Sequence, residues 1–303
     1  GSSRTYHGFI PGLFDEVLAQ RGHPLKSFNL GVTGLKLSGN VDVLRRLEAV
    51  MPEGPPRWLL IDPESPETLR DLQRRSLQGV VNWYDARTVQ LELSWILKSD
   101  MPAASRWTAA QSILHAFVFR TALVGRATPL LDPWLERGLP PEEIAFRLGP
   151  AGDGFRSKDG ANKPRPHQRH RQFLRRRDHY LEQLDNFRRA SRYEGPALEP
   201  LTPEGLAMFK RIEDAARALG LEPIFVTQPA FNLHGELRAA AELEHIATPI
   251  FLNDPGEFPE FFEIEARWEE AHLSAEGAKR FTRALAGIFA DRLDEARDRG
   301  EPR

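Results

Sequence analysis

Short apolar runs alternate with segments of helical periodicity in the first third of the chain. Lys26–Val32 and Arg57–Pro63 are rich in aliphatic residues and are bounded by Gly or Pro, which is typical of strands. Between them, Val41–Met51 has apolar residues at helical spacing. This alternation predicts a parallel sheet whose strands are joined by helices.

The same alternation returns near the C-terminal end. Glu222–Pro229 has the length and composition of a strand, and Thr248–Asp254 is a candidate last strand. Thr202, followed by Pro203, predicts a helix start, and we expect that helix to end at Gly220. Two further helices are predicted, near Glu236–His245 and from Ser274 to about Arg297.

The middle of the chain, from about 89 to 195, contains no convincing strand. Ser105–Gly125 has the periodicity of one long amphipathic helix, and His167–Arg192 is a basic helix. Between them, Gly149–Pro166 is rich in turn residues, so we expect an exposed, mobile loop. We therefore predict one domain over 1–303 with a helical insertion at about 89–195.

Composition narrows the classes of function. The chain has 303 residues, 41% hydrophobic and 28% charged, as expected of a globular domain. A net charge of −2 exerts no overall attraction on nucleic acid, and we expect no nucleic acid partner. The absence of cysteine excludes disulfides and thiolate chemistry, and no apolar run predicts a membrane segment.

Three separate blocks offer the parts of a serine hydrolase. Serine catalysis needs a hydroxyl at a sharp turn, an imidazole in reach, a carboxylate that orients the imidazole and amide donors for the oxyanion. Gly1–Arg4 (GSSR) lies shortly before a predicted helix at Pro11–Arg21. Phe28–Gly34 (FNLGVTG) runs into glycines, whose backbone amides can approach a ligand closely. Glu269–Leu273 (EEAHL) precedes the last helix.

These blocks resemble those of the SGNH (GDSL-like) hydrolases, and more narrowly the GSS-containing bacterial branch related to polysaccharide O-acetyltransferases and acetylesterases. The resemblance covers about 1–65 and 200–290. It implies an α/β fold, a three-layer α/β/α sandwich with a flavodoxin-like parallel sheet. It also implies Ser3 as nucleophile, His272 as general base, Glu269 as the orienting carboxylate and Gly34 as an oxyanion donor.

The chain departs from the family pattern at three places. Ser2 replaces an aspartate, Glu269 replaces another, and Ile61–Ser65 lacks the asparagine of the third block. Asn29 and Thr33 are the nearest candidates for an additional oxyanion or substrate contact. The leading hypothesis is an esterase or O-acyltransferase that acts on a small-molecule or carbohydrate ester. The alternative is a catalytically silent scaffold that binds a glycan or a protein.

The resemblance also predicts what lies upstream of Gly1. In the family a central strand precedes the nucleophile, so we expect an apolar strand there, and beyond it a membrane anchor of an extracytoplasmic protein. The alternative is that the first three residues are a leftover expression tag.

Two other features have a functional and a plain interpretation. Arg165–Arg192 could bind an anionic polymer, but we favour a solvated helix face balanced by acidic helices. His167, His170 and His179 fit no metal-site spacing, so we predict no metal, and nothing indicates a cofactor. Asp85, which follows Trp83 and Tyr84, lies in a segment that could cover the cleft or belong to the core.

Overall fold

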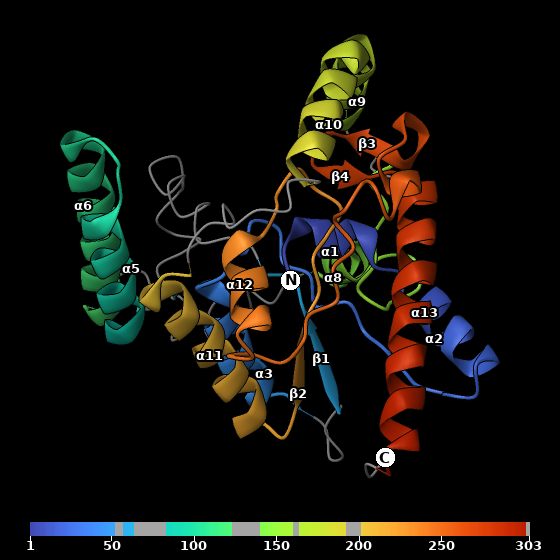
Figure 1. The fold of residues 1–303 in the computed structure, drawn as a ribbon, viewed down its shortest axis with the longest axis horizontal. Coiled ribbons are helices and arrows are strands. Elements are labelled where there is room, and N and C mark those ends of the chain that lie inside the picture. Colours follow the sequence, from blue (N-terminus) through green and yellow to red (C-terminus); the bar gives the residue numbers. More distant parts are fainter. Residues whose placement is uncertain (52–56, 64–82, 123–139, 160–163, 192–200, 301–303) are drawn as a thin grey trace.

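The fold is mixed α/β and mostly helical (Figure 1). It is described from a computed structural model that covers residues 1–51, 57–63, 83–122, 140–159, 164–191 and 201–300. The described strands form a small parallel sheet near the centre and a short hairpin near the top of Figure 1.

The parallel sheet confirms two predicted strands. β1 (Trp58–Ile61) pairs with β2 (Glu222–Phe225), with Ile61 opposite Phe225. The candidate last strand is reduced to one parallel bridge, between Val226 and Ile250.

Helices pack on both faces of this sheet. Ile224 joins a core cluster with α2 (Pro11–Gln20) and α13 (Ala275–Asp298), whereas its neighbour Phe225 joins a second cluster with α3 (Gly39–Glu48) and α11 (Pro203–Ala218). Figure 1 shows these helix pairs on opposite sides of β1 and β2. The alternation follows from the pleat, because successive strand residues point to opposite faces.

The prediction of a strand at Lys26–Val32 is wrong. The segment is irregular and lies against α1 (Ser3–Gly8), the first helix. The Asn29 side-chain amide donates to the carbonyl oxygens of Thr5 and Phe9, both at 2.8 Å. A Cβ at Gly31 would collide with the Tyr6 backbone. The segment is therefore held by a buried side chain instead of a ladder of backbone hydrogen bonds.

The described residues in the middle of the chain form helices and loops and contain no strand. The predicted long helix corresponds to α6 (Ala103–Thr121), which packs on α5 (Ala86–Lys98) around a small core of their own. The predicted basic helix is two helices, α9 (Pro164–Arg175) and α10 (Arg177–Ser191). A short helix, α8 (Pro141–Leu148), precedes them. The ends of two predicted elements, 123–125 and 160–163, lie outside the described residues.

The C-terminal part contains both well-predicted helices and a hairpin that the sequence did not reveal. Thr202 caps α11 and Ser274 caps α13, each through its side chain. Between them lie α12 (Gly235–Glu242), two 3-10 turns (Pro259–Phe261 and Ile264–Ala266), β3 (Arg267–Glu269) and β4 (His272–Leu273). β3 and β4 pair antiparallel.

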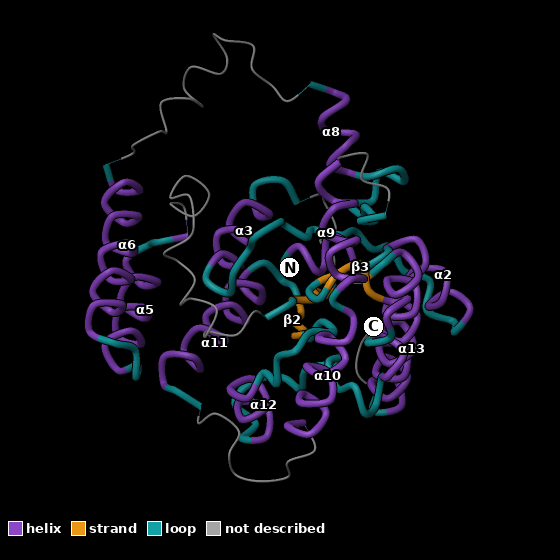
Figure 2. The backbone as a smooth tube through the Cα atoms, turned by 90° about the horizontal axis from the view of Figure 1, so that it is seen from above, coloured by secondary structure: helices purple, strands orange, loops and turns teal. Residues whose placement is uncertain are grey.

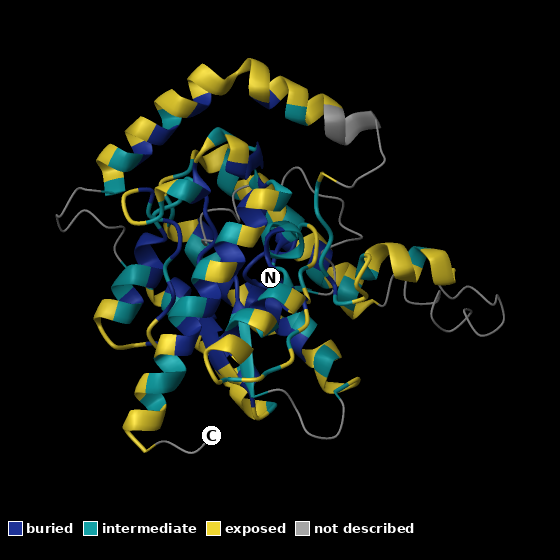
Figure 3. Cartoon of the chain, turned by 90° about the vertical axis from the view of Figure 1, so that its right-hand side faces the viewer, coloured by how far each residue is buried: buried dark blue, intermediate teal, exposed yellow. Residues whose placement is uncertain are grey.

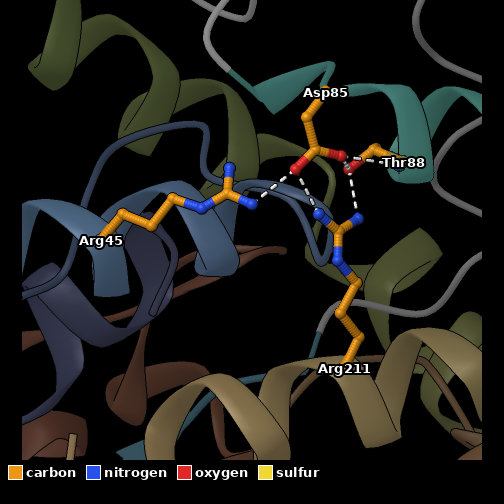
Figure 4. Close-up of polar contacts among 4 residues, drawn as sticks. All are labelled: Arg45, Asp85, Thr88 and Arg211. Atoms are coloured by element: carbon orange, nitrogen blue, oxygen red, sulfur yellow. Dashed lines mark hydrogen bonds and ion pairs between the residues drawn. The ribbon is translucent and has the colours of Figure 1, made fainter. Parts of the chain in front are cut away.

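Asp85 caps the start of α5 and contacts residues of other helices (Figure 4), while Trp83 and Tyr84 before it pack in the core cluster of α5 and α6. One carboxylate oxygen accepts from the Thr88 backbone amide at 2.8 Å. The other pairs with Arg45 at 2.6 Å and with Arg211 of α11. Burial raises the pKa of Asp85, but these hydrogen bonds and the charge of Arg211 together hold it well below its ordinary value. The carboxylate thus joins α3, α5 and α11.

Replacing Asp85 with Ala should lower the free energy of unfolding by about 1–3 kcal/mol, because a helix cap and two ion pairs are lost. Since its pKa is lowered in the folded state, its stabilisation is present above the ordinary value of 3.8 and is lost as the pH falls towards the folded-state value. Urea unfolding at pH 7 and at pH 3 measures this difference. Glu143→Gln, which removes an exposed pair with Arg147, is the control and should change stability by less than about 0.5 kcal/mol.

Gly277 permits the first turn of α13 to approach the hairpin. A Cβ there would collide with the Ala266 carbonyl oxygen, just before β3. Gly277→Ala should therefore destabilise the fold by about 1–3 kcal/mol. Gly287→Ala, in the same helix with open space around the position, should instead stabilise by about 0.5–1 kcal/mol. Thermal denaturation of the two variants checks this; equal shifts would contradict the close approach.

Candidate active site

The structure brings the two ends of the chain together at one hydroxyl and one imidazole. Helix α1, which begins at Ser3, packs against β4, which begins at His272. The distance between Ser3 Oγ and His272 Nε2 is 2.9 Å. On the other side of the ring, His272 Nδ1 bonds the Glu269 carboxylate. The three predicted residues thus form one continuous chain of hydrogen bonds.

The electrostatics of this chain suit a neutral base. Burial lowers the pKa of His272, and the Glu269 hydrogen bond only partly opposes it. Burial raises the pKa of Glu269, but the His272 hydrogen bond and nearby positive charge outweigh it, so its pKa is lowered. At neutral pH the carboxylate is charged and accepts the Nδ1 proton. The lone pair of Nε2 is then directed at the Ser3 hydroxyl.

A buried arginine holds the hairpin that carries Glu269 and His272. Arg267 is 2% exposed, and its Nη1 donates to the Pro229 carbonyl oxygen at 2.9 Å. Its other terminal nitrogen bonds the carbonyl oxygen of Glu270, in the turn between the strands. Because a buried guanidinium is costly without partners, these bonds favour one position of the hairpin.

Asp62 anchors the turn that presents Ser3. This carboxylate follows β1, is buried, and accepts from Ser2 Oγ at 2.6 Å and Thr5 Oγ1 at 3.3 Å. Burial raises the pKa of Asp62, but the charge of Arg4 and the Ser2 hydrogen bond lower it by more, so the net shift is downward. Asp62, the first residue after β1 in the segment Ile61–Ser65, therefore anchors α1. Glu64 and Ser65 of that segment lie outside the described residues.

His7 is a part of the site that sequence reasoning missed. Its ring lies edge-on to the His272 ring, with 5.7 Å between centroids. Its Nδ1 bonds the Arg156 carbonyl oxygen at 2.6 Å. Burial is the main reason that its pKa falls to about 4, so the ring is neutral. Its position one helical turn after Ser3, at i+4, is a signal that could have indicated it.

The predicted mobile loop forms one wall of the site over its described residues, 149–159. Lys158 lies near the triad, with Nζ 5.1 Å from the centre of the Trp268 ring, next to Glu269. Asp159 bonds the Ala275 backbone amide at 2.6 Å, and Asn29 donates its backbone N–H to Asp153 at 2.9 Å. Contacts at both ends tie the loop to α13 and to the segment beside α1.

Gly34 and Asn29, the predicted oxyanion or substrate contacts, have visible structural roles. Gly34 has a φ of +80° in a turn, a conformation that favours glycine. The Asn29 amide nitrogen bonds the α1 carbonyl groups described above, and its oxygen accepts from the Gly31 amide at 2.8 Å. Asn29 therefore positions the helix that carries Ser3. The oxyanion roles stay predictions.

The histidines of the basic segment serve other contacts. His170 Nδ1 bonds the Trp268 carbonyl oxygen at 2.7 Å, and His179 lies 3.9 Å from Glu182. The side chain of His167 lies outside the described residues. Across the described ranges no group of three potential ligands could hold a metal ion. Among the same residues, every helix is too short or too polar to cross a bilayer.

Comparison with known proteins gave no match to a family model, a curated protein or a solved structure. The chemistry of the site is therefore argued from its geometry and from the resemblance of its motifs.

Proposed function

We propose that the protein is a serine hydrolase or acyltransferase that acts on an ester, with an O-acyl group on a carbohydrate as the expected substrate. The observation that carries this proposal is the hydrogen-bonded chain Ser3–His272–Glu269, assembled from residues 269 positions apart in the sequence. Such a chain is the arrangement that activates a serine hydroxyl.

The geometry supports a two-step reaction. Ser3 Oγ attacks the ester carbonyl carbon while its proton passes to His272 Nε2. The tetrahedral intermediate collapses, the alkoxide leaves with that proton, and an acyl-enzyme remains. Water or a sugar hydroxyl then attacks the acyl carbon, with His272 again taking the proton. This second tetrahedral intermediate collapses, the bond to Ser3 Oγ breaks, His272 returns the proton to Ser3, and the acid or the new ester leaves. We propose that the backbone amides of Ser3 and Gly34 bind the oxyanion.

Two features support Glu269 as the orienting group in place of the family's aspartate. The hairpin carries Glu269 and His272 opposite one another in the β3–β4 register. The charge of Lys158 favours the ionised carboxylate. The pairing of β3 and β4 therefore sets the distance between Glu269 and His272 that the glutamate side chain must reach across.

The fold supports the proposed similarity to the SGNH (GDSL-like) hydrolases. We propose that β1, β2 and the segment bridged at Ile250 belong to the parallel sheet of a three-layer α/β/α sandwich. The helices on both faces of β1 and β2 support this arrangement.

A fluorophosphonate probe should label the protein at Ser3, because the activated hydroxyl attacks phosphorus as it would an acyl carbon. Ser3→Ala should abolish labelling, and His272→Ala should slow both labelling and p-nitrophenyl acetate hydrolysis by about 10³-fold or more. Ser112→Ala, at a partly exposed serine of α6, is the matched control and should react like the parent protein. Equal reaction of the parent and both triad variants would contradict the proposal and favour the silent scaffold.

The pH dependence of kcat/KM should reflect His272, which must be neutral to accept the proton. Because its pKa is lowered, activity should persist below pH 6.5 and decline only at more acidic pH. Glu269→Gln removes an influence that raises this pKa, so the decline should move to still lower pH while the maximal rate falls. A decline centred above pH 6.5 in the parent protein would contradict the assignment of the base.

A further inference from the structure

The exposed surface of α9 and of the residue just beyond it carries several arginines that have no acidic partner among the described residues. The helix contains no Asp or Glu, and Arg169, Arg171 and Arg175 are exposed, as is Arg176 just beyond it. Within the described part of the chain none of these four forms an ion pair. Further along the same basic segment, in α10, arginines do pair with carboxylates, Arg177 with Asp178 and Arg189 with Asp185. The unpaired charge is therefore concentrated on α9.

The helix that carries these arginines packs on β3, the strand that ends at Glu269. His170 of this helix bonds the Trp268 carbonyl oxygen and stacks on the Trp268 ring, 5.9 Å between centroids. Trp268 immediately precedes Glu269. Figures 1 and 2 show α9 beside β3, and Figure 3 shows the exposed outer side of this helix at the top of the molecule.

Lys158 continues the positive charge from α9 to the triad. Its Nζ lies over the Trp268 ring, 5.1 Å from the ring centre. Burial lowers the pKa of Lys158; the Glu269 charge opposes this and the Arg169 charge adds to it. The three charges are thus close enough to influence one another. Positive charge thus extends from Arg169 of α9 through Lys158 to the neighbourhood of Glu269 and His272.

We infer that the ester substrate is carried on an anionic polysaccharide, whose acidic groups bind Lys158 and the arginines of α9 while an acyl group reaches Ser3. The inference rests on the proposed function. The twelve residues of α9 rise about 18 Å, enough for several sugar units. A nucleic acid would meet the same charges, but its phosphodiesters offer no acyl group to Ser3.

Binding of polygalacturonate to Ser3→Ala protein tests the inference without turnover. In low salt, replacing Arg169, Arg171 and Arg175 with Gln should raise Kd about tenfold or more, and added salt should weaken binding of the parent protein. The charge-matched control replaces Arg87, Arg106 and Lys210 with Gln. Arg87 and Lys210 are exposed and Arg106 is partly buried, and they lie on α5, α6 and α11, away from α9. Its Kd should stay within about twofold, and neutral dextran should not bind.

Equal Kd values for the two triple variants would overturn the inference. Tighter arginine-dependent binding of single-stranded DNA than of polygalacturonate would overturn it in favour of a nucleic acid. A failure of fluorophosphonate to label Ser3 would count against the proposed function alone, because the binding measurement uses protein that lacks this hydroxyl. Five of the six substituted residues are exposed and Arg106 is partly buried, so circular dichroism should show every variant folded.

Discussion

The arrangement of the site depends on the contact between the β3–β4 hairpin and α1. Neither element is stable alone: β4 has two residues and α1 has six, too few for an isolated helix. Their positions are set by neighbours that satisfy buried polar groups. Arg267 bonds the carbonyl oxygen of Pro229 and that of Glu270 in the hairpin turn. The first turn of α13 lies close to Ala266 because Gly277 has no side chain.

The support beneath Ser3 comes from segments far apart in the sequence. Asp62 from the end of β1 binds the hydroxyls of Ser2 and Thr5, and Asn29 binds carbonyl groups near the C-terminal end of α1. A nucleophile held by several separate anchors loses little freedom on reaction, which is how a preorganised site lowers a barrier. The Ser2–Asp62 hydrogen bond joins two of these segments directly.

Predictions from sequence succeeded where the signal is local. Thr202 and Ser274 cap their helices, and β1 and β2 are apolar runs bounded by breakers. The strand predicted at Lys26–Val32 failed because a side chain, Asn29, supplies the contacts there. The β3–β4 hairpin is too short to show a period of two. Ser3, His272 and Glu269 came from the resemblance. His7 could have been indicated by its position one helical turn after Ser3, whereas Lys158 depends on tertiary contacts that no pattern encodes.

His272 bonds Glu269 through Nδ1 and Ser3 through Nε2, and the proposed chemistry depends on both bonds. ¹⁵N NMR of the histidine rings at pH 7.5 tests both bonds directly. The account predicts a protonated Nδ1 and an unprotonated Nε2, with the Nε2 resonance shifted by Ser3→Ala and the Nδ1 resonance shifted by Glu269→Gln. A His272 ring with the opposite tautomer, or with resonances unaffected by either substitution, would contradict it.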